Sequence, residues 1–171
     1  MVRTKRNHRW AQLLGAGAVM LLSLGAVAPV EASAATGAGG TSIKSELGSI
    51  GAAKATGKTL SLAKGKAGIF VIGPNGHTLY VYDKDKGTKT ACTGSCASYW
   101  PALTSSAAVT TGALVKKSEV TKVDGQKANQ IAYYGHLLYY FSGDTAPGQT
   151  NGTSIAGWHL LGPFGNVMLP R

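Results

Sequence analysis

One motif occurs twice in this chain, and the repetition limits the folds that the chain can adopt. The first copy comprises Gly76, His77, Leu79, Tyr80, Tyr82 and Asp85. At an offset of 59 residues the second comprises Gly135, His136, Leu138, Tyr139, Phe141 and Asp144. A tryptophan closes each copy, at Trp100 and Trp158, with an offset one residue shorter. So many matches at one spacing indicate that a structural unit has been duplicated.

The first 34 residues have the features of an export signal. A cationic start precedes an almost continuously apolar stretch from 11 to 28, and Ala32-Ser33-Ala34 is the small-x-small pattern that signal peptidase recognises. The alternative is a retained membrane anchor, because the apolar stretch is just long enough to span a bilayer. Gln12 and several glycines in the stretch favour cleavage, before Ala35, and no lipid-attachment cysteine follows. We expect a released, secreted or cell-envelope protein without a membrane span.

Removal of residues 1–34 leaves 13 basic and 6 acidic residues, a net charge of +7. A positive field of this size favours encounters with anionic partners. The lysines are scattered singly, and no arginine cluster or basic-aromatic stripe indicates specific nucleic-acid binding. Anionic cell-envelope polymers or another surface protein are therefore the expected partners.

Residues 35–66 consist largely of Gly, Ala, Ser, Thr and Lys, with too few apolar side chains to offset the entropy of ordering. We interpret this range as a flexible tether and place the folded domain at 67–171. Within the domain, repeat one covers about 67–112 and repeat two about 123–167.

Each copy has the pattern of a β-hairpin. Residues 67–72 favour strand, 73–76 have turn chemistry, and 77–82 return to strand-forming residues. In the second copy 130–133 and 136–141 flank a tight turn, where Gly135 supplies the positive φ of a short loop. The predicted fold class is mainly β, with two pseudo-symmetric hairpin repeats packed as one small domain.

Alternation along a strand places Tyr80 and Tyr82 on one face and their neighbours on the other. Both faces are substantially apolar, which favours a buried role for the motif aromatics over an exposed ligand platform. Asp85 and Asp144 fall where a strand should end, so we expect them to accept backbone N–H groups in turns. Each copy supplies only one motif acid, which offers no local pair for general acid/base catalysis.

The only two cysteines of the chain are Cys92 and Cys96. In an exported protein a pair this close favours a local disulfide, while metal or haem ligation and thiol redox chemistry are the alternatives. The second copy has no cysteines in the corresponding region. The repeat unit can therefore be built without a disulfide.

Soft-ligand side chains offer a second class of function, an extracytoplasmic copper, haem or electron-transfer protein. The candidates are His77, His136, His159 and Met168. Their spacing matches no recognised ligand pattern, so we expect neither a metal nor another cofactor. Trp100 and Trp158 are expected to anchor the long loop of each copy on the sheet, because each buries a large area.

These motifs resemble the bacterial secreted-repeat lipoproteins defined by Y-x-[FWY]-x-x-D. Tyr80, Tyr82 and Asp85 fit the pattern, the second copy fits it again, and the cysteine loop with Trp100-Pro101 resembles a family signature. The resemblance covers about 68–163. It implies export, tandem repeats and no established activity.

No serine-histidine-acid set, carboxylate cluster, phosphate-binding loop or nucleotide fingerprint is visible in the sequence. The sequence therefore predicts a secreted, non-enzymatic structural or interaction module at the bacterial cell envelope. The copper, haem or electron-transfer protein and the thiol redox protein are the alternatives.

Overall fold

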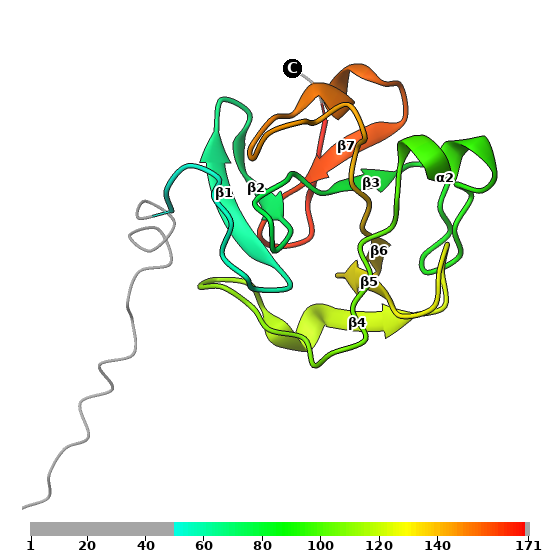
Figure 1. Cartoon of the computed structure of the whole chain (residues 1–171), viewed down its shortest axis with the longest axis horizontal. Helices are drawn as coiled ribbons and strands as arrows, with labels where there is room; N and C mark the ends of the chain where they lie inside the picture. Colours follow the sequence, from blue (N-terminus) through cyan, green and yellow to red (C-terminus); the bar gives the residue numbers. More distant parts are fainter. Residues whose placement is uncertain (1–49, 170–171) are drawn as a thin grey trace, which may run out of the picture. The chain divides into compact units, whose positions relative to one another are not determined.

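Short strands and single helical turns make up the regular structure of residues 50–169, the part of the chain that the computed structural model describes (Figure 1). The predicted signal peptide lies outside the described residues, as do residues 35–49 of the predicted tether. In chain order the elements are β1 (Ser61–Gly65), β2 (Gly68–Ile72), β3 (Tyr80–Tyr82), α2 (Ser95–Tyr99), η1 (Lys117–Glu119), β4 (Val120–Val123), β5 (Gln130–Tyr133), β6 (His136–Leu137), η2 (Asn151–Ser154), β7 (Trp158–Leu161) and β8 (Val167–Met168).

The described strands form three small antiparallel sheets, with the orders β1-β2, β3-β7-β8 and β4-β5-β6. In Figure 1 the β4-β5-β6 sheet lies at the bottom of the domain, below β3 and β7. The predicted fold class, mainly β with two repeats, is confirmed.

The first hairpin of the domain begins earlier than the sequence predicted. β1 lies inside the range assigned to the tether, and it pairs with β2 from Ser61 opposite Ile72 to Gly65 opposite Gly68. Leu60 is fully buried at its start. The tether prediction is therefore wrong for β1. Its few apolar side chains are enough for burial because the paired strand β2 supplies the rest of the apolar surface.

Repeat two contains the tight hairpin that its sequence predicts. β5 pairs with β6 through a two-residue turn, in which Tyr134 has a φ of 49° and Gly135 a φ of 78°. Two consecutive positive φ values are typical of the type I′ turns that match the twist of short hairpins. In repeat one the predicted hairpin is limited to a single bridge after β2, with Ile72 opposite Thr78, and the chain then continues into β3.

The two repeats exchange their closing segments. β3 of repeat one pairs with β7 of repeat two, with Tyr80 opposite Leu160 and Tyr82 opposite Trp158. The equivalent pairing joins the other two segments: the Tyr140 N–H donates to the Pro101 carbonyl at 2.9 Å, and the Ser142 N–H donates to Tyr99 at 2.8 Å. Strands of both repeats therefore meet in the β3-β7-β8 sheet, and the segment that closes repeat one bonds to repeat two.

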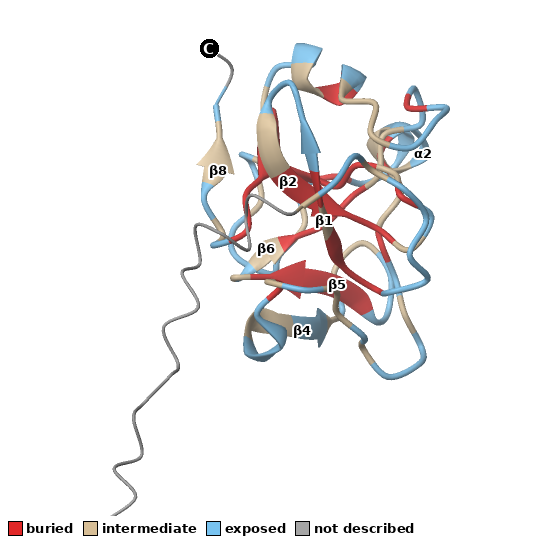
Figure 2. Ribbon diagram, turned by 90° about the vertical axis from the view of Figure 1, so that its left-hand side faces the viewer, coloured by how far each residue is buried: buried red, intermediate tan, exposed pale blue. Residues whose placement is uncertain are grey.

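Both faces of the central strands are buried, and Figure 2 shows the burial concentrated on β5 and the strands above it. Tyr80 belongs to a core cluster that contains Trp100, Tyr139 and Trp158. The alternate residues of the same strand, such as Val81, belong to a second cluster on the other side. The alternation of side chains along the strand, which the sequence predicts, thus places successive residues in two different core clusters.

Residues 50–169 include no helix with the length and apolar character needed to cross a bilayer.

Candidate functional site

The tyrosine of each motif hydrogen-bonds to the aspartate of the other motif. The Tyr80 hydroxyl donates to Asp144 Oδ2 at 2.6 Å, and the Tyr139 hydroxyl donates to Asp85 Oδ2 at 2.8 Å. Tyr80 and Tyr139 have no exposed surface, and Asp144 is 4% exposed. The two Y-x-[FWY]-x-x-D motifs therefore form one reciprocal site.

The backbones of the same tyrosines pair with each other. The Tyr80 N–H donates to the Tyr139 carbonyl at 2.8 Å, and the Tyr139 N–H donates to the Tyr80 carbonyl at 3.0 Å. Because the two residues exchange both bonds in an antiparallel bridge, a local pseudo-two-fold axis passes between them. This relation explains why equivalent residues of the two copies meet.

The second oxygen of each aspartate accepts a backbone N–H group. Asp85 Oδ1 accepts from Ala91 at 2.7 Å, and Asp144 Oδ1 accepts from Asn151 at 3.0 Å. Sequence reasoning assigned this turn-forming role to both residues. It missed the tyrosine of the other copy. The constant offset of tyrosine and aspartate indicates that a unit is duplicated, but it does not say that equivalent residues of the two copies meet.

Four aromatic rings form a stacked column across the pseudo-two-fold axis. Trp100 and Trp158 lie at its centre, with ring centroids 3.7 Å apart and planes within 1°. Phe141 stacks on Trp100 at 4.5 Å, and Tyr82 stacks on Trp158 at 4.3 Å. Each tryptophan therefore stacks on the second aromatic of the other repeat's motif and does not act only within its own copy.

The first tyrosine of each motif packs against the side of this column. Tyr80 packs edge-on to Trp100 at 5.3 Å, and Tyr139 packs edge-on to Trp158 at 5.2 Å. Gly152 permits this packing, since a Cβ built there would lie 2.7 Å from Tyr80 Cζ and 2.8 Å from Trp100 Cη2. Its N–H also donates to the Tyr80 hydroxyl at 3.2 Å.

Burial dominates the electrostatics of the site. It raises the pKa of Tyr80 well above its ordinary value, and the neighbouring Asp144 raises that pKa further. Burial likewise raises the pKa of Tyr139, with a smaller contribution in the same direction from Asp85. The pKa values of both aspartates are also raised by burial, against the opposing hydrogen bonds that they accept. The tyrosines therefore remain protonated donors across the neutral range.

The predicted disulfide is confirmed. Cys92 and Cys96 are bonded across the start of α2, and Cys92 is fully buried against the aromatic core. Next to it the Thr90 hydroxyl lies 2.8 Å from the Tyr139 hydroxyl. The corresponding turn of repeat two, η2, holds Gly152 beside Tyr80. The two halves thus support equivalent tyrosines by different local means.

The candidate soft ligands do not gather into one site within the described range. No group of three or more His, Cys, Asp or Glu side chains in residues 50–169 is arranged to hold a metal ion. His159 Nε2 lies 2.8 Å from Asp83 Oδ2, and its buried Nδ1 has no hydrogen-bond partner. Met168 lies near Gly68, and the His77 N–H bonds to an asparagine in its turn.

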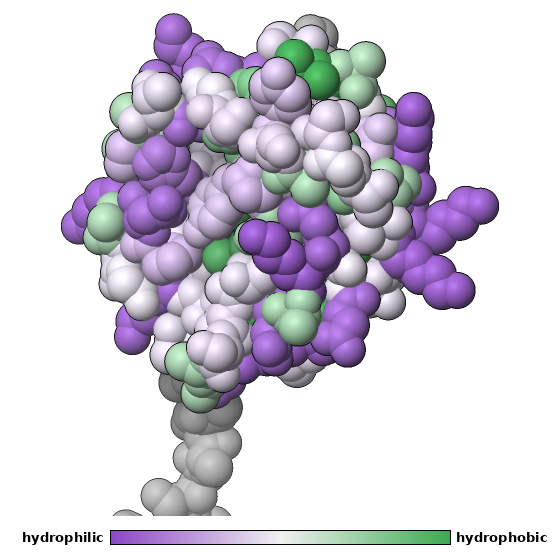
Figure 3. Space-filling model, turned by 45° about the vertical axis from the view of Figure 1, so that its right-hand side comes forward, coloured by the Kyte–Doolittle hydropathy of each residue, from purple (hydrophilic) through white to green (hydrophobic). Residues whose placement is uncertain are grey.

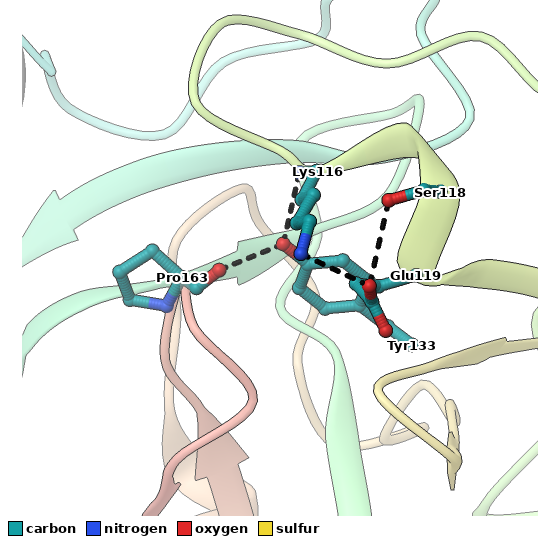
Figure 4. Close-up of polar contacts among 5 residues, drawn as sticks. All are labelled: Lys116, Ser118, Glu119, Tyr133 and Pro163. Carbon is teal, nitrogen blue, oxygen red and sulfur yellow. Dashed lines mark hydrogen bonds and ion pairs between the residues drawn. The ribbon is translucent and has the colours of Figure 1, made fainter.

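A further buried tyrosine holds the C-terminal part of the domain (Figure 4). The Tyr133 hydroxyl donates to the Pro163 carbonyl at 2.7 Å and accepts from the Lys116 N–H at 3.1 Å. Lys116 also forms an ion pair with Glu119 at 3.2 Å. This contact joins the segment between the repeats to the segment after β7, and it does not involve the motif residues.

Open hollows occur elsewhere on the domain. One of about 740 Å³ lies between the β1–β2 turn, η2 and β8, where Lys66, Thr153 and Met168 are among its lining residues. Another of about 360 Å³ lies beside Leu62. Neither hollow is lined by the paired tyrosines, aspartates or tryptophans.

Comparison with known families matches two segments of the chain, residues 61–104 and 118–161, to a family described as a secreted repeat of unknown function. The chain belongs to this family, and the protein is a secreted or cell-envelope protein. The matched repeats begin at β1 and just before β4, ahead of the predicted starts at 67 and 123. Comparisons with curated proteins and with solved structures found no match.

Proposed function

We propose that this protein is a non-enzymatic interaction module of the cell envelope, which works without a cofactor and binds anionic envelope polymers through its lysines. The observation that carries the proposal is the reciprocal use of the motif. The Tyr–Asp bonds and the aromatic column use the motif residues inside the domain, so the repeated signature serves to build a scaffold.

The surface of this scaffold is basic. The described residues hold 11 lysines against five acidic side chains, and every one of these lysines is exposed. Figure 3 shows strongly hydrophilic side chains projecting from the face that it presents. A surface of this kind attracts polyanions through a long-range field that salt screens.

The loop after β3 concentrates this charge. Lys84, Lys86 and Lys89 lie within six residues, and Lys86 and Lys89 pair in a tight turn. The two acids of the same loop are engaged elsewhere: Asp83 contacts His159, and Asp85 contacts Tyr139. The three lysines are exposed and outnumber the two acids of the loop, so the loop carries a net positive charge.

A binding assay with a polyanion tests the proposal. Purified protein is titrated with a poly(glycerol phosphate) polymer at low and at high salt, and a K84E/K86E/K89E variant is compared with the matched K116E/K117E/K122E variant. We expect salt-sensitive binding that the first variant loses to a greater extent than the second, although both change the net charge equally. Absence of binding by the native protein at low salt would rule out the anionic-polymer partner.

A further inference from the structure

The stacked column connects the interior of the domain to its surface. The central rings are buried, with Trp100 4% and Trp158 3% exposed, whereas the terminal rings of Tyr82 and Phe141 are each partly exposed. Consecutive rings are in direct stacking contact from one end to the other. An electron can pass between neighbouring π-systems at this separation without a metal or an organic cofactor.

The chemistry of the rings gives the column a direction. Indole and phenol are among the side chains that lose one electron most readily, whereas a phenylalanine ring does not do so under comparable conditions. An oxidant can therefore act at the Tyr82 end of the column but not at the Phe141 end. Lys84 Nζ lies 6.0 Å from the Tyr82 ring centroid, so an anionic oxidant would meet a cation at this end.

The two buried phenols provide the final donor. A phenol that loses an electron becomes a strong acid, so its oxidation is easiest where a base already accepts its hydrogen bond. Tyr80 and Tyr139 each pack edge-on to a central tryptophan and donate to an aspartate at 2.6 and 2.8 Å. Burial raises the pKa of both aspartates, which makes them better proton acceptors than exposed carboxylates.

We propose that this column is a one-electron relay that carries oxidising equivalents from the surface to the paired tyrosines. An anionic one-electron oxidant takes one electron at the Tyr82–Trp158 end and is reduced. Tyr80 or Tyr139 then donates an electron through the tryptophan pair to the oxidised ring, and its hydroxyl proton moves to Asp144 or Asp85. One oxidant, one phenol and one carboxylate thus become reduced oxidant, neutral tyrosyl radical and carboxylic acid.

Packing alone does not require this arrangement. Stacked rings need no carboxylate, and a buried carboxylate is unfavourable unless hydrogen bonds stabilise it. Both phenols nevertheless meet a carboxylate at the side of the column. This relay is a property separate from the polymer binding proposed above. It does not depend on that binding, because the oxidant needs only to reach Tyr82.

Flash photolysis of the full chain tests the relay, with the excited triplet of flavin mononucleotide as the anionic oxidant. Transient absorption then follows tryptophan and tyrosyl radicals. In the native protein we expect the tryptophan signal to convert into a tyrosyl signal. The D85N/D144N variant keeps an oxygen acceptor but no base, and we expect it to lose the conversion. Y99F removes an exposed tyrosine outside the column and should leave the conversion unchanged.

Circular dichroism establishes that each variant is folded, and D85N alone, at the more exposed aspartate, serves if the double variant does not fold. For D85N we expect a partial loss of the conversion. An unchanged conversion in a folded Asp→Asn variant would overturn the relay. A tyrosyl signal that Y99F abolishes would also overturn it, because the radical would then lie outside the column.

Discussion

Replacement of Tyr80 by phenylalanine tests the reciprocal site, because it removes one hydroxyl and keeps the ring. The hydroxyl donates to Asp144 and accepts from the Gly152 N–H, and both partners are buried. A hydrogen bond to a charged group contributes about 1.5–3 kcal/mol, and a buried polar group left without a partner costs about 1–3 kcal/mol. Since the carboxylate keeps its Asn151 bond, we expect a loss of about 3 kcal/mol in the free energy of unfolding.

Chemical denaturation with matched thermal unfolding measures this loss. For a domain of this size we expect the melting temperature to fall by roughly 10 °C. Y139F is the matched control: its partner Asp85 is partly exposed, so water replaces part of the lost bond and the expected cost is about 1–2 kcal/mol.

A double-mutant cycle with D144A separates the bond from the rest of the site. Without Asp144, no carboxylate is left unpaired when the Tyr80 hydroxyl is removed. Tyr80→Phe should therefore lower the free energy of unfolding by less in the D144A background, with a coupling energy of about 1–3 kcal/mol. A cost below about 0.5 kcal/mol for Y80F in the wild-type background, or additive effects in the cycle, would refute the reasoning.

Other substitutions and conditions probe the same core. Gly152→Ala should lower the free energy of unfolding by about 1–3 kcal/mol, because the added methyl overlaps two rings; a neutral result in urea denaturation would show that the turn can move away. The raised pKa values of Tyr80 and Tyr139 contribute stability that is present below pH about 10 and lost at higher pH, as the unfolded chain ionises first. Absorbance titration should therefore show at least two tyrosines that ionise only as circular dichroism reports unfolding, and ionisation of all tyrosines in the folded state would contradict this. Replacement of Cys92 and Cys96 by serine should cost about 2 kcal/mol or more in thermal unfolding, since a short loop is released and a buried site receives a hydroxyl; an unchanged melting temperature would contradict it.

The local features of the fold could be predicted from the sequence. The turn at Tyr134-Gly135 follows from glycine at a short loop, and the separation of Tyr80 from Val81 follows from strand alternation. The Cys92–Cys96 bond follows from close spacing in an exported chain. Each of these inferences concerns residues that are neighbours along the chain.

The exchange between repeats could not be predicted in the same way. β3 pairs with a strand that begins 76 residues after its own end, and periodicity gives no information about such a distant partner. β1 was missed because its apolar side chains are few, and its burial depends on β2 and on the segment near Thr111. The contact between Asp83 and His159 has no spacing signal, since it arises from the register of two exchanged strands.

The exchange has a consequence for the repeat as a unit. A single copy would leave its aspartate without the phenol donor and its tryptophan without the stacking partner that the other copy supplies. Burial of a carboxylate without such hydrogen bonds is unfavourable. The pair of repeats is therefore the smallest complete unit of this domain.

Native-state hydrogen exchange tests most directly whether the two repeats form one interlocked unit. The Tyr80 and Tyr139 amides bond to each other's carbonyl groups across the pseudo-two-fold axis. If the repeats are interlocked, both amides exchange only through global opening, with the same free energy as unfolding in denaturant. Exchange of one of these amides at a free energy roughly 2 kcal/mol or more below the other would show that one repeat opens alone, and would contradict the interlocked fold.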